Sequence, residues 1–358
     1  MNGKLSRRHI LKASAAVAAG ALGSGTFAGQ VRSAAPPPTP ITPELIGAAR
    51  KEGKVSFYTA LDLPVAEKFA KAFEGKYPGI SVRVERGGSE RLFQRIGQEQ
   101  ASRIYAVDVV NSADASHYVA WKREGLLAPY VPDDVANHFP TEHKDTDGTY
   151  AAMRAGLIVI GYNTNLVKRD EAPKGFSDLL DPRWTGKIVK AHPGYSGTAL
   201  SATYQIIRDL GWPYLEKLSK QRVMQVQSAN DSPKKLAAGE RAIMADGNEY
   251  TLLLLKEAGR PVEVVYASEG TPFVTGPSAV FNNAPNPNAA RLLQSFAFTI
   301  DAQQLLVDVG ALRSVHALVK ENRSRAPLKS IKLMSEDALG AEANSEEVKK
   351  RYSQYFHV

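Results

Sequence analysis

Short apolar runs alternate with amphipathic helical patterns along most of this sequence, and that alternation restricts the fold more than any other feature. Residues 55–61 (VSFYTAL) predict a buried strand. Residues 62–77 follow with apolar side chains at helical spacing and Pro64 in the first helical turn. Residues 80–87 (ISVRVERG) alternate between apolar and polar and predict a second strand. Repetition of this unit predicts an α/β fold, in which helices cover both faces of a parallel sheet.

The alternation is interrupted once, and the interruption divides the chain. Residues 131–156 carry prolines and mixed charge, and residues 157–167 (LIVIGYNTNLV) then predict an apolar strand that opens a second series of strands and helices. About 320 residues without the leader exceed what one core usually supports, so two lobes are expected. We assign residues 36–152 and 278–335 to lobe 1, and residues 153–277 and 336–358 to lobe 2. A ligand cleft and a hinge between the lobes follow from this layout.

The N-terminal residues 1–35 have the pattern of an export leader. Arg7 and Arg8 form a twin-arginine pair, and the Gly-, Ala- and Ser-rich run 13–28 after them is too short and too weakly apolar for a membrane span. An ordinary amphipathic helix is the alternative, but it does not explain the absence of acidic residues. We predict twin-arginine export, cleavage between Ala28 and Ala35, and a mature protein in the periplasm.

Composition excludes several functional classes. The formal charge of +8 falls to +3 once the five basic residues of the leader are removed, and no dense basic stripe with interleaved aromatics is present. This balance gives no support for nucleic-acid binding. The chain has no cysteine, which excludes disulfides, thiolate catalysis, zinc–thiolate sites and an N-terminal lipid-modified cysteine.

Small and polar residues follow the predicted strands at six places. Three of these places lie in lobe 1, after the strands that end near residues 60, 87 and 112, and three lie in lobe 2, in the sequences HPGYSGT, SANDSP and DGNEY. Each place alone fits a helix cap, since Ser, Asp and Asn favour that position. Ligands of open α/β sheets bind at the carboxyl ends of strands, so six such places together predict a shared pocket.

The stretch HPGYSGTALS (residues 192–201) allows three interpretations. A hydrolase nucleophile would need a second glycine two residues after Ser196, but Thr198 stands there, and no Asp/Glu-then-His order follows. A phosphate-binding loop of the P-loop type would need a lysine that is absent. An anion cradle needs only the free N–H groups of a helix start at Ser196, Gly197 and Thr198. A plain capped helix remains the third interpretation, and we favour the cradle.

The order of these segments resembles one protein family. An export signal followed by VSFYTAL, GGSERLFQRI, DVVNS, GYNTNLV, HPGYSGTA and DGNEY is similar to the periplasmic solute-binding proteins of ABC importers, in the branch that contains ferric-ion-binding proteins and binders of phosphorylated or other organic anions. The resemblance implies a type II periplasmic binding fold. It also implies a partner permease in the inner membrane and solute capture without catalysis.

The same resemblance separates an iron site from an anion site. Of the family's two adjacent iron-binding tyrosines only Tyr250 is matched, since Thr251 replaces the second, and Asp62 and Ala113 stand where a histidine and a glutamate are usual. The anion-binding positions are better matched, by the triplet Ser196, Gly197 and Thr198 together with Asn248 and Asn230. The pattern therefore implies an anionic organic solute, and the nearby Asp231, Asp246 and Glu249 leave a zwitterion open.

We predict a solute-binding protein with no metal and no cofactor, a monomer that binds no nucleic acid and is not an enzyme. A ferric-ion carrier is the alternative within binding proteins, and an exported hydrolase is the alternative outside them. The counter-charges for the solute are expected from Arg91, Arg95 and Arg154, each of which also fits a solvated surface position. The predicted ligand-binding residues are Tyr58, Thr59, Ala60, Gly88, Ser89, Ser112, Tyr195, Ser196, Gly197, Thr198, Asn230, Asp246, Asn248 and Tyr250.

Overall fold

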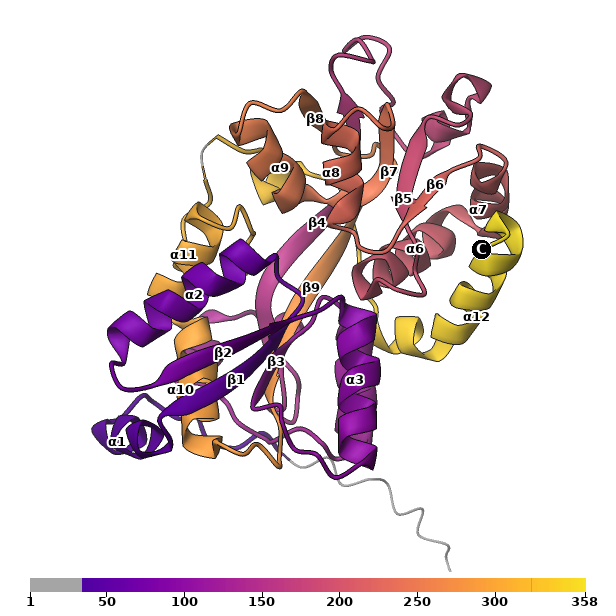
Figure 1. Ribbon diagram of the computed structural model, residues 1–358. Coiled ribbons are helices and arrows are strands. Elements are labelled where there is room, and N and C mark those ends of the chain that lie inside the picture. Colours follow the sequence, from indigo (N-terminus) through magenta and orange to yellow (C-terminus); the bar gives the residue numbers. More distant parts are fainter. Residues whose placement is uncertain (1–33, 323) are drawn as a thin grey trace, which may run out of the picture. The chain divides into compact units, whose positions relative to one another are not determined.

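The structure, a computed structural model, describes residues 34–322 and 324–358 (Figure 1), so the predicted leader lies almost entirely outside the described residues. Within the described part the strands form a ten-stranded sheet in the order β2-β1-β3-β9-β4-β7-β5-β6, with β10 beside β9 and β8 beside β4. The strands are β1 (Lys54–Thr59), β2 (Ser81–Arg86), β3 (Val109–Asn111), β4 (Ala151–Asn163), β5 (Ile188–Ala191), β6 (Met224–Val226), β7 (Ile243–Asn248), β8 (Val262–Val265), β9 (Thr271–Val280) and β10 (Leu333–Met334).

Helices connect most of these strands, as the alternation in the sequence predicts. The α-helices are α1 (Pro43–Glu52), α2 (Leu63–Lys76), α3 (Ser89–Ala101), α4 (Ala115–Arg123), α5 (Asp133–His138), α6 (Gly197–Leu210), α7 (Trp212–Ser219), α8 (Asp231–Ala237), α9 (Glu249–Glu257), α10 (Pro287–Phe298), α11 (Ile300–Asp308) and α12 (Ala338–Phe356). Short 3₁₀ turns lie at η1 (Thr141–His143), η2 (Ser177–Leu180), η3 (Pro182–Trp184) and η4 (Leu328–Ser330).

The first half of the sheet consists of the parallel strands β2, β1 and β3. Phe57 of β1 lies opposite Val84 on one side and Val109 on the other. Helices α2 and α10 cover this half, and Phe69 packs its ring 5.5 Å from Phe57 and 5.4 Å from Phe296. Burial of these apolar side chains stabilises the first half of the sheet through the hydrophobic effect, and the tilted aromatic pairs add to that stability.

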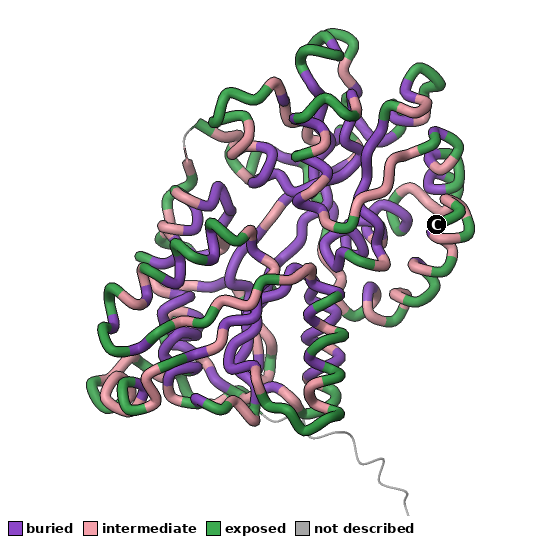
Figure 2. Tube along the Cα trace, in the orientation of Figure 1, coloured by how far each residue is buried: buried purple, intermediate pink, exposed green. Residues whose placement is uncertain are grey.

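The second half consists of β5, β6, β7 and β8. Strand β5 is parallel to β6 and β7, whereas β4 is antiparallel to β7 and β8. Its core holds the buried side chains of Ile160, Phe176, Trp184, Ile188 and Ile243. Figure 2 shows the buried residues following the strands and the inward-facing sides of the helices in both halves.

Three segments join the two halves. Strand β4 begins beside β9 and ends beside β7 and β8, and β9 returns the chain to β3. The segment around β10 then leads into α12, whose Val348 and Tyr352 pack against α6 and α7. The predicted lobe boundaries at 152–153, 277–278 and 335–336 each lie within or beside one of these segments, and the division into lobes stays a prediction.

Strand β4 is longer than the sequence predicts. The prediction placed a strand at 157–167 and left residues 131–156 irregular, but β4 starts at Ala151. Residues 151–157 are mostly small and apolar, and they pair with β9 inside the sheet. Because both faces of the strand are buried here, the sequence lacks the alternation of apolar and polar residues that predicts a strand. A partner strand more than a hundred residues later decides the structure here.

Candidate ligand-binding site

The polar strand ends come together as predicted within each half. Parallel strands β2, β1 and β3 end at one edge, where α2, α3 and α4 begin, and β5, β6 and β7 end at another, where α6, α8 and α9 begin. Helix starts carry unpaired N–H groups and partial positive charge. A hydrogen bond between Asn230 and Asp62 connects the two sets of helix starts.

Asn230 is the centre of one group of contacts between the halves. Its Oδ1 accepts hydrogen bonds from the amide of Asn248, from the hydroxyl of Tyr250 at 3.0 Å and from that of Thr251 at 3.1 Å. Its Nδ2 donates to Oδ1 of Asp62 in the first half at 2.9 Å. We call these five residues the Asn230 cluster. The sequence pointed to Asn230, Asn248 and Tyr250 as ligand-binding positions, and the structure brings them together.

Asp62 and Thr251 were not among the predicted ligand-binding residues. Asp62 is the N-cap residue of α2, yet its side chain caps no backbone N–H. It lies instead 3.9 Å from Arg86 and 3.7 Å from Lys234, so its charge is shared with two cations. Thr251, the departure from the tyrosine pair, supplies one of the three donors to Asn230. Thr251 could have been predicted as a member of this cluster from its position directly after Tyr250.

Arg154 brings a buried positive charge to the start of β4. The residue is 4% exposed, and its Nε donates to Oδ1 of Asn111 at 3.3 Å. Burial lowers its pKa, while the neighbouring Tyr250, Tyr118 and Asp62 act in the opposite direction. Within the described part of the chain no carboxylate forms an ion pair with this guanidinium. A buried cation without an anionic partner is costly, which marks Arg154 as a position suited to an anion.

Two neighbours on the sheet hold Arg154 in place. Asn111, which the sequence did not single out, donates its amide to the carbonyls of Gly276 and Pro277 at 3.0 and 2.9 Å and so presents its oxygen to Arg154. A Cβ at position 276 would lie 2.7 Å from Cγ and Nε of Arg154. Only glycine leaves room for the guanidinium here.

The start of α6 is the predicted anion cradle. Ser196 is the N-cap residue, and its Oγ accepts from the backbone N–H of Ala199 at 3.3 Å and from that of Ala229 at 3.4 Å. Thr198 is buried in the first turn. Tyr195 is 50% exposed and packs its ring against His192. The hydroxyl of Ser196 therefore serves as a helix cap, and the cradle stays a prediction.

The carboxylate of Asp114 lies against this helix start. A Cβ on Gly197 would come within 2.8 Å of Asp114 Oδ2 and of Cβ of Ser89, so Gly197 allows the two halves to touch. Oδ1 of Asp114 accepts from the N–H and hydroxyl of Ser116 at 3.0 and 2.6 Å. Its fully buried Oδ2 has no hydrogen-bond partner. A negative group at a helix N-terminus is stabilised by the helix dipole.

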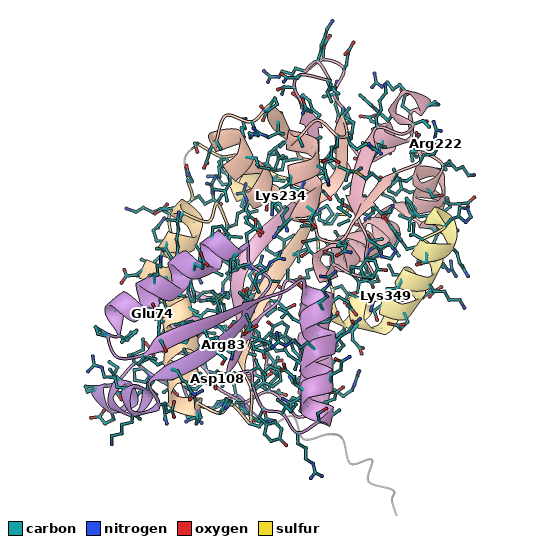
Figure 3. The ribbon with its side chains drawn as sticks, viewed as in Figure 1. Glu74, Arg83, Asp108, Arg222, Lys234 and Lys349 are labelled. Atoms are coloured by element: carbon teal, nitrogen blue, oxygen red, sulfur yellow. The ribbon has the colours of Figure 1, made fainter. Side chains whose placement is uncertain are left out.

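A second contact between the halves joins α3 to α12 and also involves α4. Lys349 of α12, labelled in Figure 3, lies 3.1 Å from a carboxylate oxygen of Glu90, and His117 of α4 lies 3.4 Å from the other. Burial alone would raise the pKa of Glu90, but hydrogen bonding and charge from His117 and Lys349 outweigh it and lower that pKa to about 2. Arg91, a predicted counter-charge, donates nearby to Gln227 of the second half.

Most of the other predicted residues have partners within their own half, and Gly88 instead faces the other half. Tyr58 points its hydroxyl to Glu99 and Arg95, and Arg95 also pairs with Glu85 at 3.1 Å. Two carboxylates thus compensate Arg95, which contributes no free charge to the Asn230 cluster. The remaining strand-end residues have backbone or side-chain contacts of their own: Thr59 with Asn111 and Leu61, Ala60 with Asn111, Ser89 with Ala113, Ser112 with Tyr118 and His117, and Gly88 close to the carbonyl of Tyr195.

Two of the three acidic residues of lobe 2 expected near the solute, Asp246 and Glu249, have cationic partners in the chain. Asp246 forms a buried ion pair with Lys190, whose Nζ also donates to Thr203 at 2.9 Å. Glu249 accepts two hydrogen bonds from Arg313, at 2.7 and 2.8 Å. Both charges are compensated inside the chain, and a role of Asp246 or Glu249 in solute binding stays a prediction.

The donor set does not favour ferric iron. Among residues 34–322 and 324–358, no three His, Cys, Asp or Glu side chains are grouped so that they could hold a metal ion. Burial, with a contribution from Asp62, raises the pKa of Tyr250 to about 12. A protonated phenol that donates to Asn230 is a poor ligand for hard ferric iron, which prefers several anionic oxygens.

Comparison with known proteins defines the class. The model of the bacterial extracellular solute-binding proteins matches residues 55–311, and the model of the twin-arginine translocation signal matches residues 4–23. The chain therefore belongs to the bacterial extracellular solute-binding protein family. The predicted twin-arginine leader is confirmed, and its residues lie outside the described part of the structure.

Two curated relatives are distant in sequence, and both are named as periplasmic binding proteins. A putative 2-aminoethylphosphonate-binding periplasmic protein of Salmonella typhimurium is 25% identical over 241 residues, which are 64% of this chain and 67% of that protein. A probable ABC transporter periplasmic-binding protein of Sinorhizobium fredii is 24% identical over 216 residues, 57% of this chain and 58% of its own length.

Solved structures support the fold. The periplasmic binding protein AfuA of Actinobacillus pleuropneumoniae, with fructose-6-phosphate bound, superposes with a TM-score of 0.79 at 23% identity over 86% of this chain and 99% of that one. Iron-bound HitA of Pseudomonas aeruginosa gives 0.73 at 21% identity over 84% and 99%. The fold is that of the type II periplasmic binding proteins, as predicted.

The protein is thus the periplasmic solute-binding component of an ABC importer, exported by the twin-arginine route. Its family is a transport family and not an enzyme family. Among the described residues, no helix combines the length and the apolar character that a membrane span requires.

Replacing Glu90 by Gln tests the contact between α3 and α12. The variant is expected to unfold with a free energy lower by up to about 3 kcal/mol at pH 7, because a pKa lowered from 4.5 to about 2 favours the ionised carboxylate in the folded state. This stabilisation is complete above the unfolded pKa of 4.5 and is lost as the pH falls towards 2. Urea unfolding at pH 7 and pH 3 measures the difference, which should shrink at pH 3.

Glu346→Gln is the matched control, since Glu346 also pairs with Lys349 but its side chain is 87% exposed. An exposed pair contributes about 0–1 kcal/mol. The role assigned to the buried contact would be contradicted if both variants lost the same free energy of unfolding. It would also be contradicted if the loss in Glu90→Gln did not depend on pH.

Proposed function

We propose that the protein captures a small organic solute that carries a phosphate, phosphonate, sulfonate or carboxylate group, and that this anion binds next to Arg154. The observation that supports the proposal is the buried guanidinium without a carboxylate partner. Asn111 and Gly276 orient that guanidinium, and a planar guanidinium matches the paired oxygens of such anions.

The Asn230 cluster would recognise the rest of the solute. It brings amide, hydroxyl and carboxylate groups of both halves together around the side-chain amide of Asn230. A solute hydroxyl or amine that enters between the halves would exchange hydrogen bonds with these groups. One relative is named for 2-aminoethylphosphonate, and one structural neighbour holds fructose-6-phosphate. Both of these solutes carry a phosphorus oxyanion together with further polar groups, which supports this solute class.

Transport would follow from the movement of lobes 1 and 2 about the three segments that join them. The contacts Asp62–Asn230 and Glu90–Lys349 connect the halves in this structure and support the proposal that such contacts stabilise a closed form. A solute that binds the closed form better shifts the equilibrium towards it, and the permease then recognises that form. We propose that the protein acts as a monomer, without catalysis and without nucleic-acid binding.

Replacing Arg154 by Met is expected to abolish the thermal stabilisation that 2-aminoethylphosphonate or fructose-6-phosphate confers. A ligand at one hundred times its Kd stabilises the folded state by about 2.7 kcal/mol, which a thermal-shift experiment detects. Arg83→Met is the control, because the side chain of Arg83, labelled in Figure 3, is 75% exposed and lies on β2 away from the cluster. Equal ligand-induced shifts in Arg154→Met and in the control would rule out the proposed anion position.

The predicted cradle has its own test. Replacing Ser196 and Thr198 by Phe is expected to abolish ligand-induced stabilisation if the N–H groups at the start of α6 hold the anion. The ligand-induced shift in melting temperature of this double variant is measured as for Arg154→Met, with circular dichroism as the control for folding. If binding is unchanged, the cradle assignment is wrong and Arg154 alone supplies the anion site.

A ferric-ion carrier is the second candidate, because iron-bound HitA shares the fold. A tyrosinate–iron complex absorbs visible light, so an iron carrier would become coloured when ferric citrate is added. With Thr251 in place of a second tyrosine, we expect the protein to stay colourless. A visible band that disappears in Tyr250→Phe would favour the iron carrier over the organic-anion binder.

A further inference from the structure

A cavity of about 570 Å³ lies beside the segments that join the two halves. Its walls come from η1 and Lys144 after it, from residues 150–152, from β9 and from residues 328–338, together with Ala115 and Val315. None of the residues that line it belongs to the Asn230 cluster or to the predicted cradle. A volume of this size is typical of small-molecule sites.

The cavity is lined by all three segments that join the halves. Ala152 belongs to β4, Phe273 and Thr275 belong to β9, and Met334 and Glu336 belong to the segment that leads into α12. Any rotation of one half against the other must bend these segments. A molecule in the cavity would therefore contact every joint of the fold at once.

Glu336 is a carboxyl group at the cavity that no cation of the described chain pairs with. Its carboxylate accepts from the backbone N–H of Thr275 at 2.8 Å and from the Thr275 hydroxyl at 2.5 Å. Within the described part of the chain no Lys, Arg or His forms an ion pair with it. Burial raises the pKa of Glu336 to about 7, and the charge of Asp114 acts in the same direction.

The basic residues of the lining do not compensate this charge. Lys144 donates its ammonium to the carbonyls of Val135 and Ala136, at 3.1 and 3.0 Å. Burial lowers the pKa of His143, which is therefore neutral at pH 7. The other ionisable groups at the cavity are Glu142, which adds negative charge, and Tyr150, whose pKa is raised by burial.

Aromatic and apolar side chains form the remaining wall. The rings of His143 and Phe273 lie 5.7 Å apart and tilted, and Tyr150, Leu333 and Met334 extend the surface. A carboxylate beside aromatic faces recognises organic ammonium groups, because the cation gains both an ion pair and cation–π attraction. Neutral or anionic molecules lack both contributions.

We infer that this cavity is a second binding site, for a small organic cation that carries an ammonium group on an apolar or aromatic body. The ammonium group binds the carboxylate of Glu336, and the body packs against Phe273, Tyr150 and Leu333. The site is independent of the anion that the proposed function places next to Arg154. It gives the protein a place where a second metabolite contacts the joints between its halves.

Benzylamine, with benzyl alcohol as its uncharged counterpart, tests the inference by isothermal titration calorimetry on the full mature chain. Wild-type protein is expected to bind benzylamine and to bind benzyl alcohol at least about tenfold more weakly, since a desolvated charge pair contributes on the order of 1.4 kcal/mol or more. Affinity for benzylamine should rise between pH 6 and pH 8, as Glu336 ionises while the amine stays protonated.

Glu336→Gln is expected to weaken benzylamine binding at least about tenfold and to remove its pH dependence. The exposed Glu347→Gln on α12 is the matched control and should bind as wild type does. A second variant, Ser335→Lys, keeps Glu336 and places a cation at an exposed lining position, so it should also weaken binding.

The inference is overturned if benzylamine does not bind, if benzyl alcohol binds equally well, or if Glu336→Gln binds benzylamine as wild type does. Each of these results leaves the Arg154 proposal intact, because the two sites share no residue. Conversely, loss of phosphonate binding in Arg154→Met leaves the benzylamine result unchanged.

Discussion

The pairing of β4 with β9 is the constraint on which the rest of the structure depends. These two antiparallel strands carry the chain from one half of the sheet to the other and back: β4 pairs with β7 and β8 of the second half, and β9 pairs with β3 of the first. The pairing fixes where Arg154 stands, because Gly276 of β9 lies directly beside its guanidinium. It also fixes one wall of the cavity at Glu336. Both candidate sites are therefore properties of the connection between the halves and not of either half alone.

Arg154 and Glu336 are opposite charges that the chain leaves without partners on this connection. Other buried charges have an ion-pair partner, as Lys190 has in Asp246 and Glu249 in Arg313, or are held by neutral donors, as Asp108 is by Ser56 and Asn286. Leaving a buried ion unpaired costs several kcal/mol of effective desolvation free energy. A ligand that supplies the missing charge at Arg154 would recover part of that cost on binding.

The sequence predicted the α/β class, the export leader and the strand-end positions, because each rests on local patterns such as periodicity, small residues and paired arginines. It could not predict the start of β4 at Ala151, since that strand depends on β9. It also could not separate Arg154 from Arg91 and Arg95. All three are arginines near strand or helix ends, and only the fold shows that Arg95 meets Glu85 and Glu99 while Arg154 meets no carboxylate. The Arg95–Glu99 pair is an i,i+4 pair on α3 that a local pattern records, but the absence of a carboxylate at Arg154 depends on contacts between distant segments.

The carboxylate of Asp114 bears on where a solute anion can bind. It lies against the start of α6, within 2.8 Å of the position that a Cβ on Gly197 would take, so the partial positive charge of this helix already faces an anion. Two like charges 4 Å apart at an effective dielectric constant of 20 repel by about 4 kcal/mol. A solute anion at residues 196–198 would have to displace Asp114, whereas one at Arg154 meets a cation that has no ion-pair partner. The electrostatics therefore favour Arg154 as the primary anion position, with the α6 start holding the two halves together.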